Sequence, residues 1–185
     1  FNAISQKALA ASAASTLPKS YWAWGPMLAA NAGGFFPFTP ATNLLYGLRE
    51  ALAMMEEEGL PRIFARHRRH GAATRAAVRA WGLTTVCRRD DEYSPVLTAV
   101  QLPEGHDADR FRAVALEQFN LSLGAGLGKL KGRVFRIGHL GDFNDLMLAG
   151  TLAGVEMALQ RAGVPARRGG VDAALDALLV QGDSA

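Results

Sequence analysis

The chain has 185 residues, of which 49% are hydrophobic, a formal net charge of +3 at pH 7 and a single cysteine, Cys87. This length suffices for one compact core with a small extension, and the longest uncharged stretch is too short for a membrane span, which needs about 20 apolar residues. One cysteine excludes an internal disulfide framework and fits a reducing, cytoplasmic compartment, and so small a net charge does not by itself indicate a nucleic-acid binder.

The first segment, residues 1–38, mixes small and aromatic residues with frequent helix breakers. The breakers are Pro18, Pro26, Gly33, Gly34 and Pro37. We therefore expect an irregular arm that buries its aromatic side chains against another part of the protein. The chain begins with Phe1, without a basic region or a cleavage site, so we expect no secretory signal and a cut N-terminal end.

A helix is predicted from about Pro40 to Glu58. Thr39 can serve as its N-cap with Pro40 at the first helical position, and Gly59 can end it. Apolar residues recur at helical spacing at Leu44, Leu48, Leu52 and Met55. The acidic end of this helix, residues 56–58, opposes the helix dipole, so these carboxylates must be solvated or paired elsewhere.

A second helix is predicted from about Pro61 to Trp81, because Ile63, His67, His70, Thr74, Ala77 and Trp81 lie in one stripe at about 100° per residue. His67 and His70 have a spacing that could place both on one metal ion, but no third ligand accompanies them. We interpret both as partly buried structural residues.

The arginines outside the stripe could neutralise phosphates, but they spread over the outer face with few aromatics, which favours a solvated surface.

The remainder of the chain reads as strands alternating with helices. Predicted strands are 83–87, 97–102, 121–123 and 134–137, and predicted helices run from Asp107 to about 119, from about 144 to 162 and from 171 to 180. The glycine-rich segment 124–128 lacks the spacing and the following helix of a dinucleotide site, so we interpret it as a flexible turn between strands. The order of elements predicts the α+β class, with a small sheet covered by helices.

Arg136 is the one charged residue in the apolar run from Val134 to Gly138. A lone charge in such a run is costly unless it meets an anion, and a guanidinium is suited to two-point binding of a carboxylate. The alternatives are an internal salt bridge with one of the many carboxylates and an outward-facing strand position. The residues alone leave all three roles open and favour these two over ligand binding.

Four segments together resemble the C-terminal half of class V pyridoxal-phosphate-dependent aminotransferases, above all the serine-glyoxylate aminotransferase group. They are SYWAW at 20–24, GFFPFTPATNLLYGLREAL at 33–52, LGAGLGKLKGRVFRIGHLGDFN at 123–144 and LAGVEMAL at 152–159. The resemblance implies the small C-terminal domain of a fold type I transferase plus a remnant of the large domain. It assigns residues 1–58 to the tail of the large domain and the connecting helix, and residues 59–185 to the small domain.

The resemblance also implies roles for single residues. In the family, the arginine of the FRIG-type motif holds the substrate carboxylate, and Arg136 is the matching residue. A threonine just before the connecting helix reaches the cofactor phosphate of the neighbouring subunit in a homodimer, and Thr39 matches it. An aromatic hydroxyl three residues earlier makes a second contact in relatives, where this sequence has Phe36, which carries no hydroxyl.

Lys7 lies in Ser5-Gln6-Lys7-Ala8-Leu9, which copies the local pattern around the family's Schiff-base lysine. In the family a Pro-Pro-Gly turn follows at once, whereas Ala10-Ala11-Ser12 follows here. The distance from Lys7 to the segment at 20–24 fits a second, non-catalytic lysine instead. We therefore expect the Schiff-base lysine to lie upstream of Phe1, and this chain alone to be inactive and to hold no pyridoxal phosphate covalently.

The resemblance implies that the full-length enzyme moves an amino group from L-serine, or a similar small amino acid, to glyoxylate, a 2-oxo acid. It implies a homodimer with pyridoxal 5'-phosphate as cofactor. Composition, charge and residue spacing separately lead us to expect a cytoplasmic protein without a metal site and with neither a nucleic acid nor a membrane as partner. Two alternatives come from other classes. One is an arginine-rich nucleic-acid-binding module, and the other is a non-catalytic domain that mediates assembly.

Overall fold

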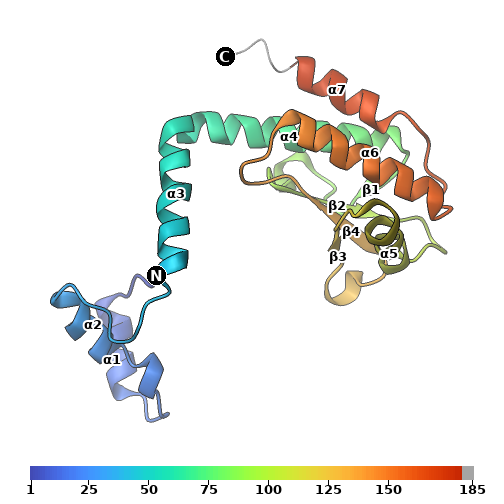
Figure 1. Ribbon diagram of the computed structural model, residues 1–185. Coiled ribbons are helices and arrows are strands. Elements are labelled where there is room, and N and C mark those ends of the chain that lie inside the picture. Colours follow the sequence, from blue (N-terminus) through green and yellow to red (C-terminus); the bar gives the residue numbers. More distant parts are fainter. Residues whose placement is uncertain (181–185) are drawn as a thin grey trace. The chain divides into compact units, whose positions relative to one another are not determined.

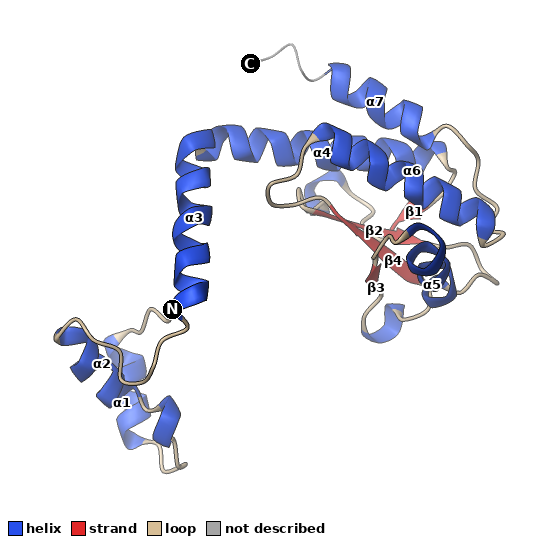
Figure 2. Ribbon diagram, in the orientation of Figure 1, coloured by secondary structure: helices blue, strands red, loops and turns tan. Residues whose placement is uncertain are grey.

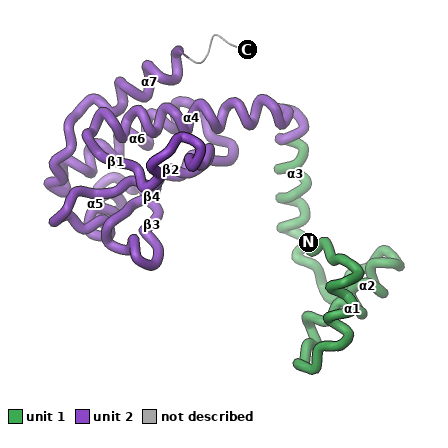
Figure 3. The backbone as a smooth tube through the Cα atoms, turned by 180° about the vertical axis from the view of Figure 1, so that it is seen from behind, with its two compact units in different colours: residues 1–54 green, residues 55–185 purple. Residues whose placement is uncertain are grey.

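The computed structural model describes residues 1–180. Contacts divide the chain into two compact units, of which the first is Phe1–Met54 and the second begins at Met55, as Figure 3 shows in two colours. The boundary lies inside helix α3, Thr42–Glu58. No helix in the described part of the chain combines the length and the apolar character that crossing a membrane requires.

The first unit is more helical than the sequence pattern predicts. It contains α1 (Gln6–Ala14), the short 3-10 helix η1 (Ser20–Trp22) and α2 (Trp24–Ala32), followed by the first part of α3. The expectation of an irregular arm is therefore wrong for these stretches. Alanine has the highest helix propensity, and Ser5 caps α1 by accepting the N–H of Ala8 at 3.2 Å. Pro18, Gly33, Gly34 and Pro37 lie outside the helices, and Pro26 lies in the first turn of α2, where proline is tolerated.

Nothing in the first unit forms a closed core. None of residues 1–54 is buried within the chain, and Trp22 is 75% exposed. Tyr21 and Phe38 lie with ring centroids 4.6 Å apart, which is one of the few aromatic contacts of this unit. The aromatic side chains that the sequence led us to expect in contact with another part of the protein are therefore still exposed here.

Helix α3 begins at Thr42 and not at Pro40, so Thr39 does not cap it and that prediction is wrong. The N–H of Thr42 donates to the carbonyl of Pro40 at 2.9 Å, and the N–H of Leu45 donates to Ala41 at 3.1 Å. A tight turn thus separates Pro40 from the helix. At the other end, Gly59 adopts φ 82°, a conformation that favours glycine, and separates α3 from α4.

The second unit is an α+β domain, as the sequence predicts (Figure 1). Its elements in chain order are α4 (Leu60–Ala80), β1 (Thr84–Thr85), η2 (Asp90–Glu92), β2 (Leu97–Gln101), α5 (Ala108–Phe119), β3 (Gly124–Ala125), η3 (Gly128–Leu130), β4 (Val134–Gly138), α6 (Asp145–Arg161) and α7 (Gly170–Val180). The predicted helices of this unit agree with the observed ones to within about one residue at each end. Asp107 caps α5, as its residue type leads one to expect, by accepting the N–H of Asp109 at 2.7 Å, and the structure adds a cap at Asn144, which accepts the N–H of Met147 at 2.9 Å.

The strands form one four-stranded antiparallel sheet in the order β1-β2-β4-β3, drawn in red in Figure 2. The prediction for the glycine-rich segment is partly wrong, because Gly124 and Ala125 pair with β4 as strand β3 and only the residues after them form the turn. The strand predicted at 121–123 lies three residues too early for the same reason. Strand β4 is central, with β2 on one side and β3 on the other.

Alternation along the strands gives the sheet two different faces. Val100 pairs with Phe135, and Thr98 pairs with Ile137, and these side chains are buried on the face that the helices cover. Phe135 packs on Phe111 of α5 with ring centroids 4.6 Å apart. Arg136 lies between Phe135 and Ile137 in the strand, so its side chain points to the opposite face of the sheet, and it is only partly buried. The sheet therefore presents Arg136 on the face that lacks this helical cover.

Candidate functional site

Arg136 is the centre of the candidate site. Its Nε donates a hydrogen bond to the carbonyl oxygen of Ala125 on the neighbouring strand β3, at 2.8 Å. Arg136 forms no ion pair with any carboxylate within residues 1–180, so the structure does not support an internal salt bridge. The hydrogen bond uses one of the guanidinium's donors and leaves both Nη groups without a protein partner in the described chain. A planar pair of N–H donors is the arrangement that binds a carboxylate at two points.

The turn after β3 has little freedom, which fixes the strand beside Arg136. A Cβ on Gly126 would overlap the carbonyl group of Leu130, so only glycine fits this position. The N–H of Gly126 donates to the carbonyl of Val134 at 2.9 Å. Gly128 follows with φ 53°, in the left-handed region that glycine tolerates best. The glycine-rich segment is thus a shaped turn rather than a flexible one.

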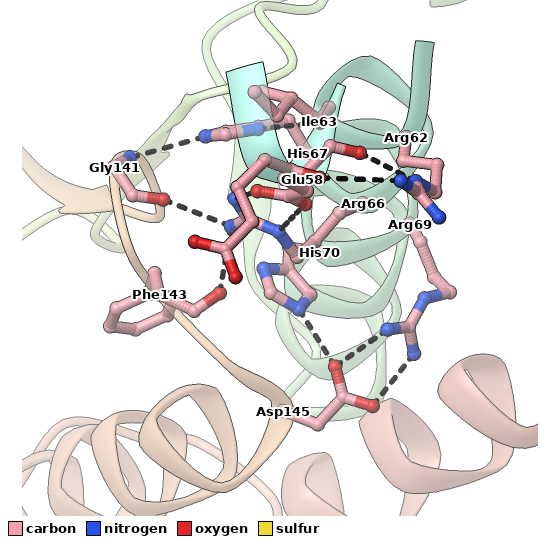
Figure 4. A network of polar contacts seen from close by, with 11 residues as sticks. Glu58, Arg62, Ile63, Arg66, His67, Arg69, His70, Gly141, Phe143 and Asp145 are labelled. Atoms are coloured by element: carbon pink, nitrogen blue, oxygen red, sulfur yellow. Dashed lines mark hydrogen bonds and ion pairs between the residues drawn. The ribbon is translucent and has the colours of Figure 1, made fainter. Parts of the chain in front are cut away.

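A polar network fixes the loop that follows β4 (Figure 4). Arg66 of α4 makes two hydrogen bonds of 2.7 Å to the carboxylate of Glu58, and its Nη1 donates to the carbonyls of Gly141 and Phe143, both at 2.9 Å. The hydrogen bond from Arg66 lowers the pKa of Glu58, and the hydrogen bond to Glu58 raises the pKa of Arg66. The expectation that the acidic end of α3 is paired elsewhere is confirmed for Glu58.

The two histidines of α4 hold neighbouring segments, His67 the loop after β4 and His70 the start of α6, Asp145–Arg161. His67 Nδ1 lies 2.7 Å from the carbonyl of Ile63, and its Nε2 lies 3.2 Å from the N–H of Gly141. The carbonyl can only accept and the N–H can only donate, so these contacts assign the neutral tautomer with the proton on Nδ1. His70 is fully buried, and burial lowers its pKa, so the neutral ring donates from Nε2 to Asp145 at 2.8 Å.

Asp145 begins α6 and also accepts two hydrogen bonds of 2.8 Å from the guanidinium of Arg69. Hydrogen bonding from Arg69, followed by that from His70, lowers the pKa of this carboxyl. Arg66 and Arg69 therefore do not belong to the solvated helix face that the sequence pattern suggested. Within the described residues no group of His, Cys, Asp and Glu is arranged to hold a metal ion. Both histidines make hydrogen bonds inside the fold, and they are more deeply buried than the sequence led us to expect.

His139, directly after β4, is fully buried and shares a hydrogen bond of 2.9 Å between its Nε2 and the hydroxyl of Thr98. Its backbone N–H donates to the carbonyl of Val96 at 3.0 Å. The sequence places it only as a strand-end residue. It ties β4 to β2 one residue beyond their last paired positions, Gly138 and Leu97.

Acidification is expected to weaken the fold through His139. Burial lowers the pKa of His139 from 6.5 to about 4. Between these two values the unfolded chain binds a proton that the folded chain does not, so the free energy of unfolding falls as the pH falls, by about 1.4 kcal/mol per pH unit. Denaturant unfolding from pH 7 to 4.5 should show this slope. His139→Gln should reduce this slope, and a slope in His139→Gln equal to that of the wild type would contradict the assignment.

Thr39 and Phe36 both line one apolar hollow of the first unit, together with Tyr21, Pro40 and Leu44. Thr39 is exposed, and its hydroxyl makes no hydrogen bond within residues 1–180. The N–H groups of the first turn of α3 follow three residues later, and such groups favour an anion. A free hydroxyl beside a helix start fits a phosphate, whereas the exposed ring of Phe36 can contribute only apolar contact.

Replacing Thr39 with valine is expected to lower retention of the cofactor in the holoenzyme without lowering its melting temperature in the cofactor-free form. Thr39 caps no helix, so the substitution removes no stabilising hydrogen bond of the fold and only the hydroxyl that the resemblance assigns to the phosphate. Cofactor affinity is measured by fluorescence titration and stability by calorimetry. Thr42→Val, at the first residue of α3, is the control and should leave cofactor affinity unchanged. Unchanged cofactor affinity in Thr39→Val would exclude the phosphate contact.

Lys7 is exposed on α1, and no hydrogen bond or ion pair within residues 1–180 holds its amine. The described part of the chain therefore shows nothing near Lys7 that would orient its amine toward a cofactor.

Sequence reasoning did not identify Glu58, Arg66, Arg69 and Asp145 as a network, because Arg69 meets Asp145 and Arg66 meets Gly141 and Phe143 across more than 70 residues of chain. The acidic end of α3 was the one signal that pointed to part of it.

The chain is similar in sequence to several known aminotransferases, although no protein-family model matches it. It is 47% identical over 177 residues to the serine–glyoxylate aminotransferase of Methylorubrum extorquens and 48% identical over 172 residues to that of Arabidopsis thaliana. The L-aspartate–glyoxylate aminotransferase of Paracoccus denitrificans is 39% identical over 171 residues. Each alignment covers 92% of this chain, and the chain spans 43–44% of the length of these relatives.

Solved structures agree with this result. The ureidoglycine–glyoxylate aminotransferase of Bacillus subtilis superposes with a TM-score of 0.80 at 33% identity, covering 90% of this chain and 44% of that one. The pyridoxamine–pyruvate aminotransferase of Mesorhizobium loti gives a TM-score of 0.78 at 29% identity, covering 96% of this chain and 46% of that one. The chain is therefore a homologue of the C-terminal portion of class V pyridoxal-phosphate-dependent aminotransferases of the serine–glyoxylate type.

Proposed function

We propose that this chain works as the C-terminal part of an aminotransferase that moves an amino group from L-serine, or a similar small amino acid, to glyoxylate. In this proposal residues 1–58 are the tail of the large domain with the connecting helix, and residues 59–185 are the small domain. When bound, pyridoxal phosphate supplies the electron sink for the transfer. The Schiff-base lysine lies in the part of the enzyme upstream of Phe1.

The observation that carries the proposal is the guanidinium of Arg136. It is partly buried on the central strand, its Nε is held by Ala125 at 2.8 Å, and no carboxylate of the described chain neutralises it. Both substrates of such a transfer, the amino acid and the 2-oxo acid, have a carboxylate next to the reacting carbon. One fixed guanidinium can therefore bind both in turn, which orients the reacting carbon for the transfer.

The first unit supports the dimeric part of the proposal. Its apolar and aromatic side chains remain exposed in this chain, and exposed apolar surface of this kind usually meets another protein surface. We propose that the remainder of the large domain and a second subunit cover it in a cytoplasmic homodimer, with Thr39 reaching the cofactor phosphate. The alternative of an arginine-rich nucleic-acid binder loses support, because Arg66 and Arg69 are committed to internal carboxylates.

A panel of amino donors tests the proposal. Full-length holoenzyme is incubated with glyoxylate and, separately, with L-serine, L-aspartate and L-alanine, and the glycine formed is quantified. Glycine production that is fastest with L-serine supports the proposed activity. Faster production with L-aspartate would retain the aminotransferase but reassign the donor, and no glycine from any donor would overturn the proposal.

A further inference from the structure

Arg136 lies opposite two unusually small residues in the sheet. On β2 its paired residue is Ala99, and on β3 its paired residue is Gly124. Directly opposed residues of an antiparallel pair have their Cβ atoms about 4.5–5.5 Å apart, so a side chain at either position would lie beside that of Arg136. The side chain leans toward β3, where it bonds to Ala125. Gly124 is therefore the position that decides how much room the guanidinium has.

The distances show that the side chain of Arg136 already fills the space beside Gly124. A Cβ added to Gly124 would lie 3.1 Å from both Cβ and Nε of Arg136 and 3.5 Å from its Cζ. The contact with the Cβ of Arg136 can be relieved only if the two strands move apart by a few tenths of an ångström, whereas the contacts with Nε and Cζ can be relieved by moving the guanidinium. Nε, whose hydrogen bond to Ala125 orients the group, is one of the two atoms in closest contact.

Strand β3 cannot easily move away to relieve the contact. The carbonyl of Leu123, just before Gly124, accepts a hydrogen bond of 2.7 Å from Nε of Arg112 on α5, and Arg112 is itself paired with Asp109 at 3.0 Å. On the other side, the N–H of Gly126 is bonded to Val134. Both ends of the Gly124–Ala125 segment are thus anchored, so the strand can yield only slightly, and an added methyl group would also displace the guanidinium.

Backbone strain does not explain the glycine. The backbone of Gly124 lies outside the left-handed region, so alanine can adopt it without strain. Gly126 differs, because there an added Cβ would overlap the backbone of Leu130 itself. What glycine provides at position 124 is space beside one side chain.

We propose that Gly124 is a positioning residue for substrate recognition, in that its missing side chain lets Ala125 hold Nε of Arg136 so that both Nη groups face the substrate carboxylate. This rests on the proposed function, in which Arg136 binds that carboxylate. Gly124 acts only through Arg136 and touches neither substrate nor cofactor. Its substitution should therefore weaken ligands that carry a carboxylate and spare ligands that do not.

The test compares two amines in the full-length holoenzyme. L-Serine has a carboxylate and ethanolamine lacks it, and the affinity for each is read from the change in cofactor absorption. Gly124→Ala is expected to weaken L-serine about tenfold, the effect of losing one good hydrogen bond to a charged group, and to change ethanolamine less than about twofold. The inhibition constant of propionate should rise in parallel. Because only cofactor-loaded enzyme gives the signal, a loss of folded protein does not alter the ratio of the two affinities.

Two further variants make the result decisive. Gly150→Ala on α6 is the matched control, since an added Cβ there meets no atom within 4 Å, and it should leave both affinities unchanged. Arg136→Gln should weaken L-serine and propionate at least as much as Gly124→Ala does. Selective weakening by Gly124→Ala and Arg136→Gln supports the inference. If Arg136→Gln is selective and Gly124→Ala is not, Gly124 has no positioning role; if neither is selective, the carboxylate assignment of Arg136 fails as well.

Discussion

Arg136→Lys in the full-length enzyme is expected to lower kcat/KM with amino-acid donors by at least about tenfold. Lysine retains the charge but replaces a planar pair of donors with a single ammonium group, and it cannot keep the Nε bond to Ala125 that orients the side chain. A hydrogen bond to a charged group contributes about 1.5 to 3 kcal/mol, and losing one corresponds to a factor of about ten or more. Steady-state kinetics with L-serine and glyoxylate measure the effect.

Arg133→Lys is the matched control for this prediction, because Arg133 is exposed three residues before Arg136, directly before β4, and makes no side-chain hydrogen bond within residues 1–180. It should leave kcat/KM unchanged. An Arg136→Lys enzyme with the kinetics of the wild type would contradict the assignment of Arg136 to the substrate carboxylate.

The second large effect concerns the chain by itself, which is expected to show no transaminase activity and no stoichiometric attachment of pyridoxal phosphate to Lys7. A Schiff base needs an unprotonated amine aimed at the aldehyde, and the exposed side chain of Lys7 on α1 has no partner in the described chain that would orient it. Alanine and serine follow it, where the family has a proline turn.

The measurement is to mix the purified chain with pyridoxal phosphate, reduce with borohydride and locate modified lysines by mass spectrometry. Lys19, Lys129 and Lys131 serve as internal controls for non-specific labelling. Labelling of Lys7 at one equivalent, together with conversion of L-serine and glyoxylate, would show that the segment at 5–9 is the cofactor site.

The helices of the second unit were predictable because their determinants are local. The apolar and histidine stripe of α4, the cap residues Asp107 and Asn144, and the glycine after α3 all act within a few residues of where they stand. The α+β class followed from the order of elements. The start of α3 was predicted two residues too early. This difference bears on function, because a helix that begins at Thr42 does not use Thr39 as its cap and leaves the Thr39 hydroxyl exposed.

What could not be predicted depends on contacts between distant residues. Strand β3 contains only Gly124 and Ala125, which have low strand propensity, and it exists because β4 pairs with it. The pairing of Arg69 with Asp145 joins residues far apart in the chain, and nothing in the spacing of the arginines distinguishes Arg66 and Arg69 from their exposed neighbours. Arg136 could be singled out from its apolar surroundings, but its free Nη groups could be recognised only in the structure.

A crystal structure of the full-length holoenzyme with a bound carboxylate inhibitor such as propionate tests the central claim most directly. Two hydrogen bonds of about 2.7–2.9 Å should join the two Nη groups of Arg136 to the two carboxylate oxygens, with Nε still bonded to the carbonyl of Ala125. A carboxylate bound elsewhere, with Arg136 paired to an acidic side chain of the enzyme, would contradict the assignment of this residue and with it the proposed role of the small domain.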